Sequence, residues 1–224
     1  VDDGSADDTP RLVDEFARSH PQVSLLNLPH RGKGGAVRSG MLHAKGQRRF
    51  LCDADLSMPI GQLERFLVPD LAGYDIVIGS REAPGARRFN EPSRRHFMGR
   101  AFNLMARVFA VRSPSAEGRS IRDTQCGFKL FRAEAAEALF PLQRTEGFGF
   151  DIEVLFLAQR LGMRLVETPI DWYYMSHSKV RPIKDGLAMA RDILRVRWRA
   201  LRGVYGRLSP SRYARVDTNH KEEP

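Results

Sequence analysis

The feature that most constrains the fold of this chain is a regular alternation of short apolar segments with longer amphipathic ones. Segments such as 50–52 and 76–78 are typical of buried strands, and the apolar spacing between them is typical of helices. An acidic or glycine-containing turn follows three such segments, in "VDDGS", "LCDAD" and "IVIGSR". This alternation predicts an α/β fold with a mostly parallel sheet and helices on both faces. Ligands of such sheets bind beyond the carboxyl ends of the strands, so the three turns should converge.

The chain is predicted to form one domain over residues 1–206 and a disordered tail over 207–224. The first strand of the sheet is expected to be missing, because only Val1 precedes the first acidic turn. Thr9 is the expected cap of the first helix, with Pro10 at its first position. Further strands are expected at 23–28, 128–131 and 163–172, and helices at 9–19, 61–71, 94–111, 151–161 and 185–204. One more helix is expected to follow the glycine loop at 30–35 and to run through about residue 44.

The charge of the chain predicts an anionic partner. The net charge is +9 and the pI is near 10.1, with much of the excess between residues 181 and 207. A nucleic-acid-binding module is the alternative from another class, but the sequence has no helix-turn-helix, RRM or zinc-finger signature. The two cysteines, Cys52 and Cys126, lack the spacing of a disulfide framework or a zinc site, which favours a reducing cytosolic setting. No apolar run approaches the roughly 18 residues that span a bilayer, and no export signal is visible.

Two carboxylates, Asp53 and Asp55, stand on either side of a single alanine after the strand that ends at Cys52. They repel each other, so a positive charge is expected between them. A hard divalent cation, Mg²⁺ or Mn²⁺, binds to carboxylates together with phosphate oxygens and would supply that charge. The alternative is that one aspartate caps the helix near Gly61 while the other is solvated.

A glycine-rich stretch, "RGKGGAVRSG", is a candidate anion site. Gly32, Gly34 and Gly35 would let backbone N–H groups approach an anion at a helix N-terminus, and Lys33 and Arg38 would add positive charge. It matches neither the Walker A pattern nor G-x-G-x-x-G, so neither an ATPase nor a dinucleotide-binding fold is supported. The alternative is a flexible turn in front of an amphipathic helix.

Six motifs together carry a resemblance to a known family. "VDDGSADDT", "RGKGGAVRSGM", "DADLSMP", "GSR", "DTQCGFKLF" and "FGFDIEVLFLAQRLG", followed by "SKV" and a basic helix, resemble the family 2 glycosyltransferases with the Rossmann-like GT-A fold. Within the family the chain is most similar to dolichyl-phosphate β-glucosyltransferases, with dolichyl-phosphate mannose synthases as near relatives. The resemblance covers Val1 to about Gly206. It implies inverting transfer of a sugar from a nucleotide diphosphate donor to a polyprenyl phosphate.

The resemblance also implies roles for individual residues. The nucleotide sugar would contact Asp2, Asp3, Lys33, Asp53 and Gln125. Asp53 and Asp55 would hold the metal, with Asp55 as the more direct ligand, and Asp55, Asp123 and Arg81 form the expected catalytic set. The phosphate of the acceptor would contact Arg81, Arg94, Arg95, Lys129 and Lys179. The family's usual opening strand, which ends in a Pro-x-Tyr/Phe-Asn-Glu turn, is absent from this sequence. A truncated record is the favoured interpretation of that absence.

The helices at 94–111 and 185–204 are predicted to lie at a membrane surface. In the second, one apolar stripe is flanked by basic residues, a pattern that suits the interface of an anionic bilayer. The stripe is Leu187, Ala190, Leu194, Trp198 and Leu201, and its flanks are Arg191, Arg195, Arg199 and Arg202. Packing against the sheet is the alternative. We therefore expect a peripheral protein on the cytoplasmic face of a membrane, of unspecified oligomeric state. Its donor is UDP-glucose, GDP-mannose or UDP-N-acetylglucosamine, and the glycine-rich stretch favours glucose.

Overall fold

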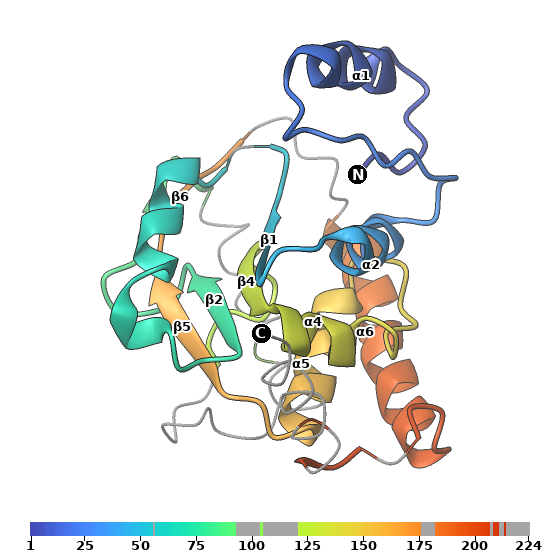
Figure 1. Ribbon diagram of the computed structural model, residues 1–224. Coiled ribbons are helices and arrows are strands. Elements are labelled where there is room, and N and C mark those ends of the chain that lie inside the picture. The colour runs from blue at the N-terminus through green and yellow to red at the C-terminus, as the bar shows by residue number, and fades with distance from the viewer. Residues whose placement is uncertain are drawn as a thin grey trace, which may run out of the picture.

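The computed structural model describes residues 1–55, 57–92, 104, 121–175, 182–206, 208–210 and 213. Its centre is a sheet of four strands in the order β1 (Arg48–Cys52), β4 (Phe128–Arg132), β2 (Ile76–Ser80) and β5 (Leu165–Pro169), shown in Figure 1. A second, two-stranded sheet pairs β3 (Arg87–Phe89) with β6 (Asp171–Tyr173) in parallel.

Three strands of the central sheet point in the same direction, as predicted, and β4 runs against them. β2 and β5 pair in parallel, whereas β4 is antiparallel to both β1 and β2. The antiparallel strand was not foreseen, since an apolar segment shows no direction in its sequence. Its position between β1 and β2 brings the loop before it, residues 121–127, to the carboxyl ends of both neighbours.

Alternate residues of the strands bury opposite faces of the sheet, which gives the molecule three layers. Ile76 and Ile78 belong to one core with Met41, Phe131 and Leu155, whereas Val77 belongs to the other. On the first face lie α2 (Lys33–His43), α4 (Ala133–Leu139) and α5 (Phe150–Arg160), with α6 (Pro182–Leu201) beyond them. On the second face lie the 3₁₀ helices η1 (Ile60–Phe66) and η2 (Pro69–Leu71).

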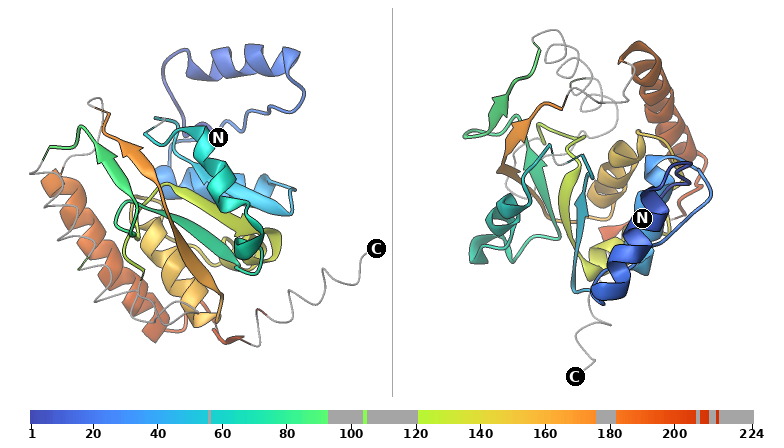
Figure 2. Two further views of the ribbon diagram at one scale, coloured as in Figure 1. Left: turned by 90° about the vertical axis from the view of Figure 1, so that its left-hand side faces the viewer. Right: turned by 90° about the horizontal axis from the view of Figure 1, so that it is seen from above.

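The N-terminal helix α1 (Thr9–Ser19) forms where predicted and buries none of its residues. It stands apart from the sheet in Figures 1 and 2. The expected cap is wrong: Asp8 occupies the N-cap position, Thr9 is already helical, and Asp8 makes no capping hydrogen bond. The backbone N–H of Thr9 donates instead to Asp7 Oδ1 at 3.0 Å.

Several other expectations differ from the structure. The strand expected at 23–28 is reduced to one bridge between Asp2 and Asn27. The helix expected at 61–71 is the pair of 3₁₀ helices, and the strand expected at 163–172 is divided into β5 and β6 on either side of Ile170. In the tail predicted to be disordered, Tyr213 is buried and its hydroxyl donates to Asp75 Oδ1 at 2.7 Å, so the prediction is wrong at that residue. The helix expected at 94–111 lies outside the described residues, apart from position 104.

Candidate functional site

The two aspartates after β1 lie beside the first residue of α2. Lys33 Nζ is 2.6 Å from Asp53 Oδ1, and both side chains are about three-quarters buried. Burial on its own would lower the pKa of Lys33, but the carboxylates of Asp53, Asp151 and Asp55 raise it above its ordinary value. Lys33 is therefore charged, and it supplies part of the positive charge that the pair of aspartates requires.

Gly127 leaves space for the carboxylate of Asp53. The Asp53 N–H donates to the Gly127 carbonyl at 3.1 Å, and a Cβ added at Gly127 would lie 2.0 Å from Asp53 Oδ2. A larger residue at 127 would displace this carboxylate. The loop before β4 thus holds the backbone of Asp53 by a hydrogen bond and leaves room for its side chain.

Asp55 is exposed, and its Oδ1 accepts a hydrogen bond from the Ser57 N–H at 3.0 Å. It therefore caps its own turn and not the helix near Gly61. In the part of the chain that the structure describes, no three His, Cys, Asp or Glu side chains gather into a metal site. Two carboxylates at one strand end nevertheless fit a hard cation such as Mg²⁺ or Mn²⁺, which commonly takes its remaining ligands from phosphate oxygens and water. The donor set is suited to a cation that arrives with a diphosphate.

Lys129 lies beneath this site and not on its surface. Its side chain is 1% exposed, and Nζ donates to Asp151 Oδ1 and to the Cys126 carbonyl, each at 2.6 Å. The predicted contact of Lys129 with an acceptor phosphate is therefore wrong, because an ammonium that is buried and held by two internal acceptors does not reach the surface. Burial raises the pKa of Asp151, although Lys129 and Lys33 act to lower it.

Asp151 was missed by sequence reasoning as a member of the site. It occupies the second position of α5, after the glycine-containing stretch "EGFGF". Its charge acts on Lys33 and Asp53 as well as on Lys129, so four alternating charges run inward from Asp53. An acidic residue in the first turn of a helix was the available signal, but that signal is common because such residues favour helix N-termini.

A second polar cluster lies at the end of β2, centred on Arg81 and Asp123. Arg81 Nε and Nη2 donate to the two carboxylate oxygens of Asp123 at 2.7 and 2.9 Å, and the Arg81 N–H donates to Oδ2 at 3.0 Å. The ring of Trp172 lies 5.6 Å from the same guanidinium. Asp123 is completely buried, which would raise its pKa, but the charge and hydrogen bonds of Arg81 lower that pKa to about 2. These two residues neutralise each other, and their contact with substrate stays a prediction.

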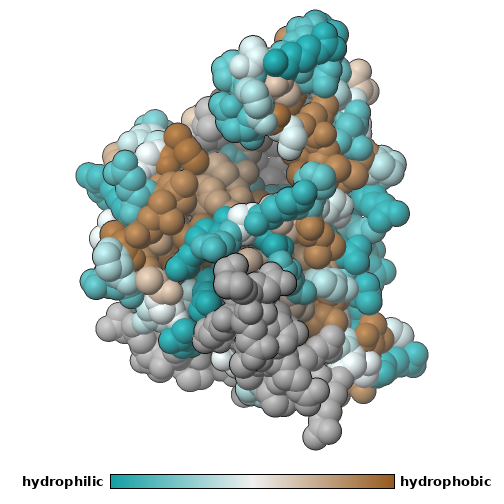
Figure 3. Space-filling model, in the orientation of Figure 1, coloured by the Kyte–Doolittle hydropathy of each residue, from teal (hydrophilic) through white to brown (hydrophobic). Residues whose placement is uncertain are grey.

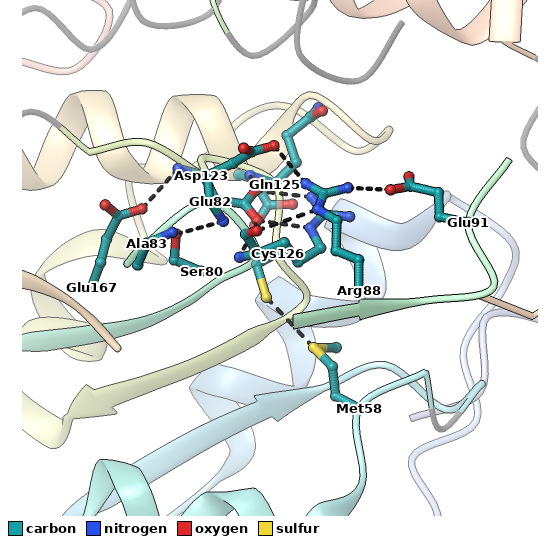
Figure 4. A network of polar contacts seen from close by, with 12 residues as sticks. Met58, Ser80, Glu82, Ala83, Arg88, Glu91, Asp123, Gln125, Cys126 and Glu167 are labelled. Carbon is teal, nitrogen blue, oxygen red and sulfur yellow. Dashed lines mark hydrogen bonds and ion pairs between the residues drawn. The ribbon is translucent and has the colours of Figure 1, made fainter. Parts of the chain in front are cut away.

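The surroundings of this pair are shown in Figure 4. Glu167 Oε1 accepts from the Asp123 N–H at 2.7 Å, and Gln125 N–H donates to Asp123 Oδ1 at 3.3 Å. Arg88 bridges Glu82 and Glu91 at 2.5 and 2.6 Å. The side-chain amide of Gln125 points out of the cluster to Met189 Sδ on α6, at 2.8 Å. The loop that carries Asp123 is thus held on its buried side, while Gln125 faces α6.

The glycine-rich stretch folds differently from the expected anion site. The N–H groups of Gly34 and Gly35 both donate to the Glu146 carbonyl, at 2.7 and 3.2 Å. The N–H groups of Arg31 and Gly32 donate to the two carboxylate oxygens of Asp3, at 2.9 and 2.8 Å. The predicted cradle of glycine N–H groups is therefore wrong for an external anion, because internal oxygens already occupy these donors.

Of the remaining residues predicted for the site, some are described by the structure and others lie outside the described residues. Asp2 is buried and accepts hydrogen bonds from the N–H groups of Gly4 and Ser5, and the Ser5 hydroxyl is the first cause of its lowered pKa. Arg38 donates to the Phe140 carbonyl at 2.9 Å, away from Asp53. Three residues expected at the acceptor phosphate lie outside the described residues, namely Arg94, Arg95 and Lys179.

The sequence also matches known proteins over most of its length. Residues 1–140 match glycosyl transferase family 2. The chain belongs to this family. A dolichyl-phosphate beta-glucosyltransferase of Trichomonas vaginalis is 37% identical over 203 residues, which cover 88% of this chain and 58% of that protein. One of Dictyostelium discoideum is 34% identical over 220 residues, which cover 92% of this chain and 63% of that protein. The chain thus spans about three-fifths of the length of these relatives.

Solved structures with the same fold bear out the predicted GT-A architecture. Glucosyl-3-phosphoglycerate synthase of Mycobacterium tuberculosis with phosphoglyceric acid superposes with a TM-score of 0.55 at 21% identity, covering 87% of this chain and 65% of that one. The same enzyme with Mn²⁺, UDP and glucosyl-3-phosphoglycerate gives 0.54 at 22% identity, over 88% and 65%. Within the described part of the chain, none of the helices has the length and apolar character needed to cross a membrane.

Proposed function

We propose that residues 1–206 are the catalytic domain of an inverting, metal-dependent hexosyltransferase. It transfers glucose from UDP-glucose to a polyprenyl phosphate of the dolichyl type, for glycan or glycoprotein assembly. The observation that carries the proposal is the alignment of about nine-tenths of the chain with proteins named dolichyl-phosphate beta-glucosyltransferase. The paired aspartates beside Lys33 support it, since they suit the cation and the diphosphate of a nucleotide sugar.

The chemistry needs little acid–base assistance from the chain. A phosphate monoester has a second pKa near 6, so the acceptor is largely a dianion at pH 7 and is already nucleophilic. The main requirement is to position the two substrates and to neutralise the departing diphosphate. Lys33 brings a positive charge to this place, and Gly127 leaves room for the Asp53 carboxylate beside it. A divalent cation held by Asp53 and Asp55 would supply Lewis-acid neutralisation when bound.

The donor is tested by a screen with radiolabelled UDP-glucose, GDP-mannose and UDP-N-acetylglucosamine, using a short polyprenyl phosphate and either Mg²⁺ or Mn²⁺. We expect transfer from UDP-glucose only. Transfer from GDP-mannose alone would make the protein a mannose synthase. Binding of UDP-glucose with neither transfer nor hydrolysis would indicate a noncatalytic sugar-nucleotide-binding fragment. The screen should use both this chain and a longer form, because the relatives extend beyond the matched region.

The proposed setting is the cytoplasmic face of a membrane, with α6 at the interface. Ile193 and Val196 of this helix are buried in the core, which fixes its inner side. Four large apolar residues on its other side are 52–88% exposed, namely Leu187, Leu194, Trp198 and Leu201. The predicted stripe therefore faces outward, which supports an interfacial role over packing against the sheet. Figure 2 shows α6 along the outside of the molecule. Figure 3 has the orientation of Figure 1, and on its right, where Figure 1 has α6, hydrophobic patches lie among polar residues.

Membrane binding is tested by changing this stripe without touching the core. The triple variant Leu187→Ser, Leu194→Ser and Leu201→Ser should fold normally, because all three side chains are exposed. Its affinity for anionic vesicles, measured by sedimentation, should fall by at least about tenfold. The reason is that burying each leucine in the membrane contributes about 1.5–3 kcal/mol. A control variant, Leu12→Ser with Leu67→Ser, changes two leucines that are exposed on other parts of the chain. Equal sedimentation of both variants would exclude α6 as the membrane contact.

A further inference from the structure

A pocket of about 330 Å³ lies between the loop 144–148 and α6. Among the residues that the structure describes, four arginines line it, and the acidic residues of the lining are Glu146 and Asp192. The arginines are Arg144 from the loop and Arg191, Arg195 and Arg199 from α6. Phe148, Ala188 and Met189 add an apolar wall. A pocket with this lining has an excess of positive charge beside apolar surface.

The four arginines are not equally available to a ligand. Arg199 Nη1 is 3.2 Å from Oε1 of the completely buried Glu153 and from Thr145 Oγ1, so it is part of the internal structure. Arg195 makes a longer contact of 3.7 Å with Asp192. Over the described residues, the guanidiniums of Arg144 and Arg191 make no hydrogen bond or ion pair, and both residues are exposed. Two to three guanidiniums at this pocket are therefore able to receive an anion.

We infer that this pocket binds a phosphate monoester. A guanidinium presents paired N–H donors that match the oxygens of a phosphate, and several around one anion are a common way to hold it. The inner arginine Arg199, held by Glu153, keeps the wall in place, while Arg144 and Arg191 approach from the loop and from the helix. Free phosphate and the headgroup of a lipid share this chemistry.

The lipid-borne form is favoured by what surrounds the pocket. Arg191 lies on α6 between the exposed Leu187 and Leu194, so a headgroup at Arg191 would leave its chain beside the apolar stripe. The pocket also adjoins the candidate site, because Gln125 Nε2 donates to the lining residue Met189. This part of the inference rests on the proposed function, in which the lipid is a polyprenyl phosphate.

Binding is measured without nucleotide sugar, metal or turnover, so the result does not depend on the proposed transfer reaction. Isothermal titration calorimetry uses inorganic phosphate, and sedimentation uses phosphatidylcholine vesicles with or without a short-chain polyprenyl phosphate. The pocket variant is Arg144→Gln with Arg191→Gln. The matched control, Arg160→Gln with Arg197→Gln, removes the same charge from positions on α5 and α6 that do not line the pocket. Circular dichroism checks the fold of both.

We expect the pocket variant to bind inorganic phosphate at least about tenfold more weakly than the wild type, because it loses two charge-assisted hydrogen-bonding groups. The control variant should bind as the wild type does. The same pattern with polyprenyl phosphate vesicles identifies the lipid headgroup as a ligand, and its restriction to inorganic phosphate identifies a soluble one. Equal losses in both variants, or no phosphate binding by the wild type, would overturn the inference.

Discussion

Replacing Asp123 with Asn tests whether the pair it forms with Arg81 holds the fold. The pKa of Asp123 is about 2 in the folded chain, against an ordinary value of 3.8. This difference corresponds to about 2 kcal/mol of stability at neutral pH, because the folded state prefers the ionised form by that amount. Asn has the shape of a neutral carboxyl group, so Asp123→Asn should lower the free energy of unfolding by a similar amount. Little of this is lost to solvent screening, since Asp123 is buried and Arg81 is 22% exposed.

The pH dependence gives this loss a signature. A depressed carboxylate pKa contributes stability that is present above about pH 3.8 and is lost as the pH falls toward 2. The difference in unfolding free energy between the wild type and Asp123→Asn should therefore be about 2 kcal/mol at pH 7 and roughly half of that at pH 3. A purely steric defect would cost the same at both values.

Urea denaturation at the two pH values is the assay. With a slope of about 2–3 kcal/mol per molar for a chain of this size, the midpoint at pH 7 should fall by about 1 M. The matched control is Asp14→Asn, which removes an exposed carboxylate paired with Arg18 and should cost less than about 0.5 kcal/mol. An unchanged midpoint for Asp123→Asn, combined with lost transferase activity, would refute the structural role and favour direct contact of Asp123 with substrate.

Three further outcomes follow from the charges around Asp53. Asp55→Asn should leave the urea midpoint unchanged but lower transferase activity by more than about tenfold, since an amide is a poor ligand for a hard cation; full activity in the presence of chelator would contradict a metal role. Lys33→Met should tighten Mn²⁺ binding without nucleotide by about tenfold, measured by electron paramagnetic resonance, because Lys33 occupies Asp53 and repels a cation. Lys129→Met should destabilise the chain by about 3–5 kcal/mol by leaving Asp151 buried without its partner, whereas an unaltered midpoint would show that the pair is weak.

The sequence allowed the position of the candidate site to be predicted because strand ends are visible in it. An apolar segment that stops at an acidic pair predicts Asp53 and Asp55 at the carboxyl end of a strand, and in the structure they directly follow the end of β1. Lys33 could be named as a positive charge within a glycine-rich stretch, and the structure has it as the first residue of α2. These residues depend on local signals, such as a change in periodicity or a turn residue.

The pairing of charges across the molecule could not be predicted in this way. Lys129 and Asp151 are 22 residues apart, and Arg81 and Asp123 are 42 apart, so only tertiary packing shows that they face each other. Lys129 was expected to contact the acceptor phosphate, whereas its partner in the structure is the buried carboxylate of Asp151. The same limit applies to β4, whose direction depends on its neighbours and not on its own residues.

The loop 144–148 connects the site at Asp53 and Lys33 with the arginine-lined pocket beside α6. Its Glu146 carbonyl receives the N–H groups of Gly34 and Gly35, directly after Lys33, and the Gln143 side chain donates both to the Gly34 carbonyl and to the Thr145 carbonyl. The N–H and side chain of Thr145 contact Glu153 and Arg199, which fixes the loop against α5 and α6. A Cβ at Gly34 would lie 2.4 Å from the Thr145 carbonyl oxygen, so the two segments are too close for a side chain at position 34. A phosphate held at Arg144 would therefore bind to the same hydrogen-bonded unit that positions Lys33 beside Asp53.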